Sequence, residues 1–433
     1  MLQAPLISTA NDLEALIGEK NLLRLGLDTG FTQRSRSITA PRLVPCLLQS
    51  MAGGKIEAIA DVKRDFNRTY GLQVKYKPFY DRLNRPEFPS LMRSLLSDCV
   101  SRLRENMLHA TKDGPFAGFD DILIQDGSSF GLRDGLAEKF PGRFNDKSPA
   151  AIAVHLLMSV RQDNITHVKI SSQADCERHY LPKPENLSGK LILLDRGYDD
   201  TNYMRQVDDA GGSFLVRMRS IHDPIVEKIY RSGRRYRVLE GNHLSWVLSK
   251  IPKNRAVDLC ISVSHKDKVV PSSFRLVASW NSETKAWMRL MTNMTRDIIS
   301  MRKVLQAYHI RWQIELIFKE FKSYTNMHKF QTNKQFIAEG LLLAALCAAF
   351  VRRFIAARCQ AMTYTAISTR RVAMCQFLIS EVLTAIRCGS SQLVTTLGEI
   401  FSFMRSNCQR TNIRREYARG RCALGLSPCH QEA

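Results

Sequence analysis

The stretch KLILLDRGYDDTNYMRQVDDAGGSFLVRMRS, Lys190–Ser220, decides the fold class. LILLD is a short apolar run, which predicts a buried strand that ends in a turn at Asp195. Thr201–Gly212 has the pattern of a helix closed by glycine, and Ser213–Ser220 predicts a second strand. A strand, a helix and a strand in this order predict an α/β core.

The segment before this stretch predicts the rest of the sheet. Asp121–Phe130, DILIQDGSSF, is an apolar run that we expect to end in a turn at Asp126. Ala150–Val160 and Ile165–Ser171 are β-rich runs separated by RQDN, which predicts a hairpin. The sheet is therefore expected to be mixed, with flanking helices.

The segment after it predicts a β-rich interruption of the core. Residues 221–293 contain the short runs RRYRVLE, LSWVLSK, VDLCISVSH, FRLVASW and AWMRLMTN, which we expect to be strands. A long helical pattern then starts at Thr295, and both ends of the chain are expected to be helical. The expected divisions are a helical N-terminal region at 1–115, the first part of the core at 116–220, the β-rich insertion at 221–293, the second part of the core at 294–345 and a basic helical region at 346–433.

The charge of the chain indicates its partner. Lys and Arg number 63 against 41 Asp and Glu, so that the net charge is +22. An excess of this size spread along a globular chain favours a polyanion such as double-stranded DNA. The longest uncharged apolar run, Gly340–Val351, is too short to span a bilayer and predicts a buried core helix. We therefore expect no membrane partner and a cytoplasmic location.

The eleven cysteines are expected to be reduced thiols, most of them buried, because their number is odd and no CxxC occurs. Cys408, Cys422, Cys429 and His430 lie near one another in the sequence, but their spacing is not that of a zinc site.

A candidate DNA-binding element lies near the N-terminus. Ile56–Gly71 and Val74–Arg85 resemble a helix-turn-helix rich in Lys and Arg, with Tyr76, Phe79 and Tyr80 interleaved. A basic helix pair that presents aromatic side chains is typical of a DNA reader. An ordinary helical hairpin with solvated basic side chains explains the same pattern equally well.

Two aspartates occupy matching places in the predicted sheet. Asp126 and Asp195 each follow an apolar run, and ligands of α/β sheets bind at the carboxyl ends of strands. Neighbouring aspartates there would suit one or two divalent cations, because Mg²⁺ prefers carboxylate oxygens. The alternative for either residue is a simple turn former.

A third signal lies on the long helical pattern. Tyr308, Arg311, Glu315 and Lys322 fall within a sector of about 60° at about 100° per residue. The stripe therefore carries a phenol, a guanidinium, a carboxylate and an ammonium group. A solvated face with an Arg311–Glu315 ion pair is the alternative.

These residues match a known motif. The pattern Y-x2-R-x3-E-x6-K in YHIRWQIELIFKEFKS resembles the YREK signature of bacterial insertion-sequence transposases of the DDE class, in the insertion-sequence-four subgroup. LILLDRGY resembles the second motif of that subgroup, and DILIQDGSSF resembles the first. The 119 residues between Asp195 and Glu315 are similar to the subgroup's β-rich insertion.

The resemblance implies an RNase H-like core in which Asp126, Asp195 and Glu315 are the catalytic, metal-binding triad. The expected cofactor is Mg²⁺, which Mn²⁺ can replace, and the mechanism uses two metal ions. Arg311 and Lys322 are expected to neutralise DNA phosphates, and Tyr308 to donate a hydrogen bond to a phosphate or stack on a base.

The function expected is that of a cut-and-paste DNA transposase, which cleaves the terminal inverted repeats of an insertion sequence and joins them to target DNA. The resemblance also implies a homodimer in the synaptic complex and a bacterial, nucleoid-associated location. A metal-dependent nuclease of the same fold and a non-catalytic DNA-binding repressor are the two alternatives.

Overall fold

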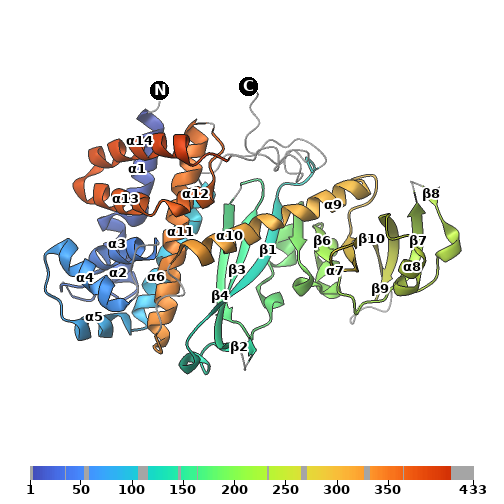
Figure 1. Ribbon diagram of the computed structural model, residues 1–433, viewed down its shortest axis with the longest axis horizontal. Helices are drawn as coiled ribbons and strands as arrows, with labels where there is room; N and C mark the ends of the chain where they lie inside the picture. Colours follow the sequence, from blue (N-terminus) through green and yellow to red (C-terminus); the bar gives the residue numbers. More distant parts are fainter. Residues whose placement is uncertain are drawn as a thin grey trace.

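The computed structural model describes residues 3–34, 36–52, 58–105, 116–144, 148–162, 164–231, 234–264, 271–325, 332–363 and 365–410. The helices at the two ends of the chain pack together on one side of the molecule, and the sheet extends away from them (Figure 1). The N-terminal helices are α1 (Gln3–Ile17), α2 (Glu19–Asp28), α3 (Ala40–Met51), α4 (Ile59–Tyr70), α5 (Tyr76–Leu83) and α6 (Glu87–Glu105). The C-terminal helices are α11 (Gln335–Thr363), α12 (Thr369–Met374), α13 (Phe377–Cys388) and α14 (Ser390–Asn407).

The sheet is mixed, as expected. Its strand order is β2-β3-β1-β5-β6-β11-β10-β9-β7-β8, and β4 pairs with β3. The antiparallel strands are β1 (Ile122–Gly131), β2 (Pro141–Phe144), β3 (Ser148–Ser159) and β4 (Asn164–Ser172). β5 (Leu191–Leu194), α7 (Thr201–Asp209) and β6 (Ser213–Arg217) form the predicted strand, helix and strand, and β5 runs parallel to β1.

The β-rich block continues the same sheet, because β11 pairs with β6 in antiparallel orientation. Its elements are β7 (Ile225–Arg231), β8 (Arg234–Arg235), α8 (Leu244–Lys250), β9 (Val257–Val263), β10 (Ser272–Asn281) and β11 (Ala286–Thr292). The strand prediction for LSWVLSK was wrong: this segment is α8. Leu244, Val247 and Leu248 are buried at helical spacing, so one face of a helix covers the sheet. Of RRYRVLE, only the first two residues are in a strand.

The predicted turn at Asp126 was also wrong. β1 runs on through Asp126, and its pairing with β3 continues to Gly131 opposite Ala151. The parallel pairing with β5 stops earlier, at Gln125 opposite Leu194. Asp126 therefore lies in the middle of a strand, at the point where its parallel neighbour ends.

The helical pattern predicted from Thr295 is shorter and is divided at Arg311. α9 (Met301–Ile310) begins after the N-cap Ser300, and α10 (Trp312–Tyr324) follows Arg311. Arg275 of β10 donates hydrogen bonds to the carbonyls of Met294, Thr295 and Ile299. Because the guanidinium binds these carbonyls, the segment before Ser300 is held outside the helix.

Short 3-10 helices complete the secondary structure. They comprise Asp134–Leu136, Glu177–Tyr180, Pro184–Leu187, Arg196–Tyr198 and Arg237–Leu239. Figure 1 shows α9 and α10 crossing the sheet from the β-rich block toward α11.

The predicted core helix is confirmed as part of α11, which packs against α6 and α3. α11 is long and apolar enough to cross a membrane, but 94% of its most apolar window is buried inside the protein. Gly340 permits the close approach of α6, because a Cβ atom there would lie 2.3 Å from the Phe88 ring.

A buried cation joins the helical parts. Arg352 of α11 is 1% exposed and donates hydrogen bonds to the carbonyls of Ala52, Tyr324 and Ala373. These carbonyls lie at the C-terminal ends of α3, α10 and α12, where the partial charge of a helix is negative. Arg352 therefore fixes the end of α10 against both terminal regions.

Candidate active site

The pairing of β1 with β5 brings the two aspartates together. Gln125 lies opposite Leu194, so that Asp126 and Asp195 follow at equivalent positions on neighbouring strands. The backbone N–H of Gly127 donates to Asp126 Oδ1 at 2.9 Å. Asp195 directly follows β5 and precedes the short helix Arg196–Tyr198, as the predicted turn requires.

The junction of α9 and α10 brings three further side chains to this edge. Tyr308 Oη donates to Asp195 Oδ1 at 3.0 Å. Arg311 Nη1 donates to Asp126 Oδ2 at 3.2 Å, and its Nη2 donates to Glu315. One guanidinium thus joins two carboxylates that lie 189 positions apart in the sequence. The Tyr308 side is not a solvated face, because this residue is only 8% exposed.

Burial governs the electrostatics of the site. It raises the pKa of Asp126 to about 7, although Arg311 and the Gly127 N–H act in the opposite direction, and the charges of Asp195 and Glu315 raise it further. Burial also raises the pKa of Tyr308 well above its usual range, and the nearby Asp195 adds to this effect. Burial opposes the charge of Arg311, but the surrounding acidic groups raise its pKa above normal.

The donor set suits a hard divalent cation, because all three acidic groups are carboxylates that reach one edge of the sheet. In the described part of the chain, however, no three His, Cys, Asp or Glu side chains are already placed to hold one ion. Arg311 lies between Asp126 and Glu315 and provides the positive charge there. The three carboxylates are therefore chemically suited to bind a metal ion. Arg311 must move away from Asp126 and Glu315 before all three carboxylates can coordinate it.

Lys322, the last residue of the stripe, lies beside the site and not within it. Its ammonium group is 5.3 Å from the centre of the Phe130 ring, and Phe130 follows Asp126 on the same strand. Lys322 is exposed and therefore available to a ligand that approaches the sheet edge. The structure brings together the other five predicted residues directly.

The sequence reasoning missed the packing behind Asp126. A Cβ atom on Gly127 would lie 3.1 Å from His155 Nδ1 and 3.3 Å from Tyr198 Oη, so that only glycine fits without displacement. His155 stacks on Tyr180 at 4.0 Å and is in hydrogen-bond contact with Ser171 through Nε2, at 2.9 Å. Two features of the sequence could have pointed to this packing: Tyr198 belongs to the LILLDRGY motif, and His155 interrupts an apolar run.

The N-terminal helix pair exists, as α4 and α5, with Phe66 packed on Phe79 at 5.5 Å. Several of its basic side chains have acidic partners on the same helix, which lowers the positive charge it offers to DNA. These pairs are Arg64–Asp61, Arg68–Asp65 and Lys77–Asp81. Its DNA-reading role stays a prediction.

Of the C-terminal cysteine group only Cys408 is described, and it is buried; Cys422, Cys429 and His430 lie outside the described residues.

Comparison with known proteins identifies the family of this site. The family described as "Transposase DDE domain" matches residues 117–351, which is more than half of the chain and includes all six predicted site residues. The chain belongs to this family. The DNA transposase function, the DDE enzyme class and the binding of DNA expected from the sequence are thereby confirmed, and the family implies a divalent metal ion.

Insertion-sequence transposases are among the similar proteins. The chain is 23% identical over 335 residues to the transposase of IS1151 from Clostridium perfringens, covering 69% of this chain and 70% of that one. It is 22% identical over 277 residues to the transposase of IS231D from Bacillus thuringiensis subsp. finitimus, covering 56% and 58%. These matches confirm the resemblance to insertion-sequence transposases. A solved piggyBac transposase synaptic complex with hairpin DNA matches at TM-score 0.46 and 10% identity, over 93% of this chain and 85% of that one.

Proposed function

We propose that this transposase cuts and pastes an insertion sequence, with Asp126, Asp195 and Glu315 as the catalytic, metal-binding carboxylates of an RNase H-like core in the YREK subgroup. The observation that carries the proposal is the convergence of the stripe on the sheet edge. Tyr308 binds Asp195, and Arg311 binds both Asp126 and Glu315. An unrelated solvated helix face would have no reason to contact both aspartates.

The chemistry requires the three carboxylates to hold Mg²⁺, or Mn²⁺ in its place. When bound, such ions activate the attacking water or 3′-hydroxyl and stabilise the leaving oxygen of the phosphodiester. The buried position of Asp126 keeps water from screening its charge, and the strands fix both aspartates rigidly. Tyr308 orients Asp195 through its hydrogen bond, so that this carboxylate has one defined direction.

Arg311 has two successive partners in this scheme. Without DNA it neutralises Asp126 and Glu315. A DNA phosphate at the sheet edge offers the guanidinium a bidentate acceptor, which draws it away from the carboxylates. Lys322 is exposed beside β1 and contacts the next stretch of the same strand. We also propose that two copies act together at paired transposon ends, at the bacterial nucleoid.

The test uses duplexes that carry the inverted repeats flanking the gene. Asp126→Asn, Asp195→Asn and Glu315→Gln should each abolish strand cleavage and retain DNA binding, because each removes one carboxylate charge without changing shape. The matched control is Glu138→Gln, whose side chain is 87% exposed away from the site, and it should cleave normally. Cleavage by all three site variants would refute the assignment.

A nuclease of the same fold would cut but not join. Incubating a pre-cleaved transposon end with target DNA separates the two functions, because only a transposase forms the joined product. A protein that cleaves the ends but never yields joined strands would contradict the cut-and-paste proposal.

A further inference from the structure

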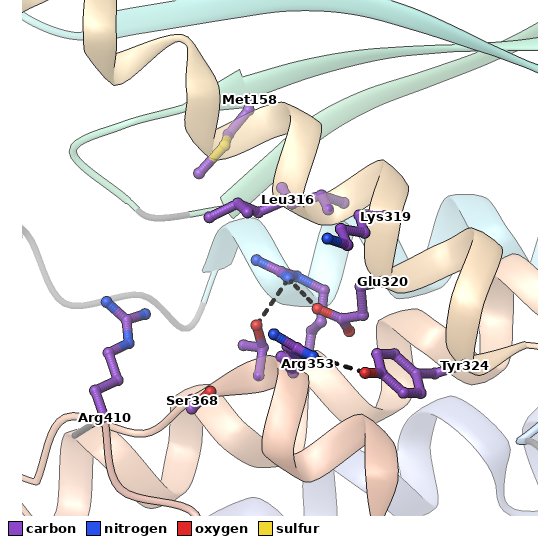
Figure 2. Close-up of a pocket in the computed structure, with 11 residues that line it drawn as sticks. Met158, Leu316, Lys319, Glu320, Tyr324, Arg353, Ser368 and Arg410 are labelled. Carbon is purple, nitrogen blue, oxygen red and sulfur yellow. Dashed lines mark hydrogen bonds and ion pairs between the residues drawn. The ribbon is translucent and has the colours of Figure 1, made fainter. Parts of the chain in front are cut away.

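A second polar site lies beside α10, further toward the C-terminal end of this helix than Glu315. A cavity of about 260 Å³ opens between α10, α11 and the chain around α12 (Figure 2). Its lining combines four cations with one carboxylate: Lys319, Arg353, Arg370, Arg410 and Glu320. No step of the proposed reaction uses these residues.

The charge of this cavity is not balanced from within. Arg353 Nη1 donates to Glu320 Oε2 at 3.1 Å, and both side chains are buried, so this pair is neutral. Figure 2 shows the pair on one side of the cavity and Arg410 on the other. Lys319 and Arg370 therefore contribute two positive charges that the Glu320 carboxylate does not offset, and Arg410 is a further cation of the lining.

Arg370 and Arg410 each donate a hydrogen bond to a neutral group. Arg370 Nε donates to Tyr324 Oη at 3.1 Å, and Arg410 Nε donates to the carbonyl of Ile367 at 2.9 Å. Among the described residues, no acidic side chain forms an ion pair with Lys319 or Arg370. A cluster of cations positioned by neutral acceptors is suited to an anion with several oxygens.

The cavity lies close to the proposed scissile phosphate. Lys319 comes one helical turn after Glu315 on α10, which places it about 6 Å further along the helix axis and about 40° around it. Each strand of duplex DNA carries one phosphate per about 3.4 Å of axis. A strand that is bound at Glu315 and runs along α10 would therefore bring its phosphates past the cavity within about two nucleotides.

We propose that this cavity binds backbone phosphates of the DNA strand adjacent to the cleavage point, through Lys319, Arg370 and Arg410. The inference rests on the proposed function, because it uses the position of the strand at Glu315. The recognised chemistry is a phosphate group, which either DNA or free inorganic phosphate can supply. The experiment distinguishes these two sources.

The test measures how the affinity for DNA depends on salt. The protein Lys319→Ala/Arg370→Ala is compared with the wild type, using a duplex of about 40 base pairs with the flanking inverted repeat and fluorescence anisotropy without metal. Each lost phosphate contact lowers the slope of log K against log salt by about 0.9. The slope should therefore fall by about 1.8, and the affinity at low salt should fall at least about ten-fold.

The matched control is Lys20→Ala/Lys139→Ala, which removes the same charge from exposed lysines outside the cavity. It should keep the wild-type slope. Arg370→Lys, which retains the charge, should lose much less affinity than Arg370→Ala. Thermal melting of each variant identifies any loss of folding, which would lower the active fraction without changing the slope.

Three outcomes have distinct meanings. The first outcome is that the wild type cleaves the repeats, but the double variant has the same slope of log K against log salt as the wild type. This result would overturn the inference about the cavity and leave the proposed function intact. Binding of inorganic phosphate that the double variant loses, with an unchanged DNA slope, would assign the cavity to free phosphate and would also overturn it. A wild-type protein that neither binds nor cuts the repeats would refute the proposed function instead.

Discussion

Asp126→Asn should stabilise the metal-free protein, and increasingly so as the pH rises. Burial raises the pKa of Asp126 from 3.8 in the unfolded chain to about 7 in the folded one. Between these values the folded state holds a proton that the unfolded state has lost, so stability falls as the pH rises through this window. Below pH 3.8 both states are protonated and the effect vanishes.

The size of the effect follows from the same two values. At about 1.36 kcal/mol for each pH unit, the gap between 3.8 and about 7 corresponds to about 4 kcal/mol. About two thirds of this loss falls between pH 5 and pH 8.5. Asparagine resembles the protonated carboxyl in shape and cannot ionise, so the variant escapes the loss and still offers Arg311 an oxygen.

The assay is denaturant unfolding at pH 5 and pH 8.5 in the presence of a chelator. The advantage of Asp126→Asn over the wild type should grow by roughly 2–3 kcal/mol between the two pH values. Glu138→Gln, the exposed control, should show no such growth. If Asp126→Asn is destabilised by the same amount at both pH values, then burial does not disfavour the Asp126 charge and the electrostatic reasoning is refuted.

Three further predictions concern packing and metal. Arg352→Met should lower the free energy of unfolding by at least about 3 kcal/mol in denaturant melts, because three carbonyls at buried or partly buried helix ends lose their donor; a loss below about 1 kcal/mol would contradict this. Gly340→Ala should lower the free energy of unfolding by about 1–3 kcal/mol, because the added methyl group collides with the Phe88 ring. The control Gly398→Ala on α14, where a Cβ atom would lie 3.7 Å from its nearest neighbour, should leave this free energy unchanged or raise it. Mg²⁺ at about one hundred times its Kd should stabilise the wild type by about 2.7 kcal/mol and leave Asp195→Asn unaffected; equal gains would show binding elsewhere.

The sequence predicted the features that depend on near neighbours in the chain. The spacing of Tyr308, Arg311 and Glu315 puts these side chains on one face of a helical segment, whatever that segment packs against. The apolar run before Asp195 and the Arg-Gly-Tyr turn after it are also local, and the structure has the strand and the turn there. The domain divisions and the catalytic roles stay predictions.

Only the tertiary structure decided where β1 ends, where α9 begins and what fills the space between side chains. Asp126 lies within β1 because β3 continues to pair with β1 beyond this residue. The sequence of β1 by itself does not show how far its partner strand extends. Likewise α9 starts late because Arg275, on a distant strand, binds the carbonyls before it. Helix spacing and turn chemistry act over a few residues, so a single segment reveals them. Pairing, burial and the contact of Arg311 with two distant carboxylates depend on segments that meet only after the chain has folded.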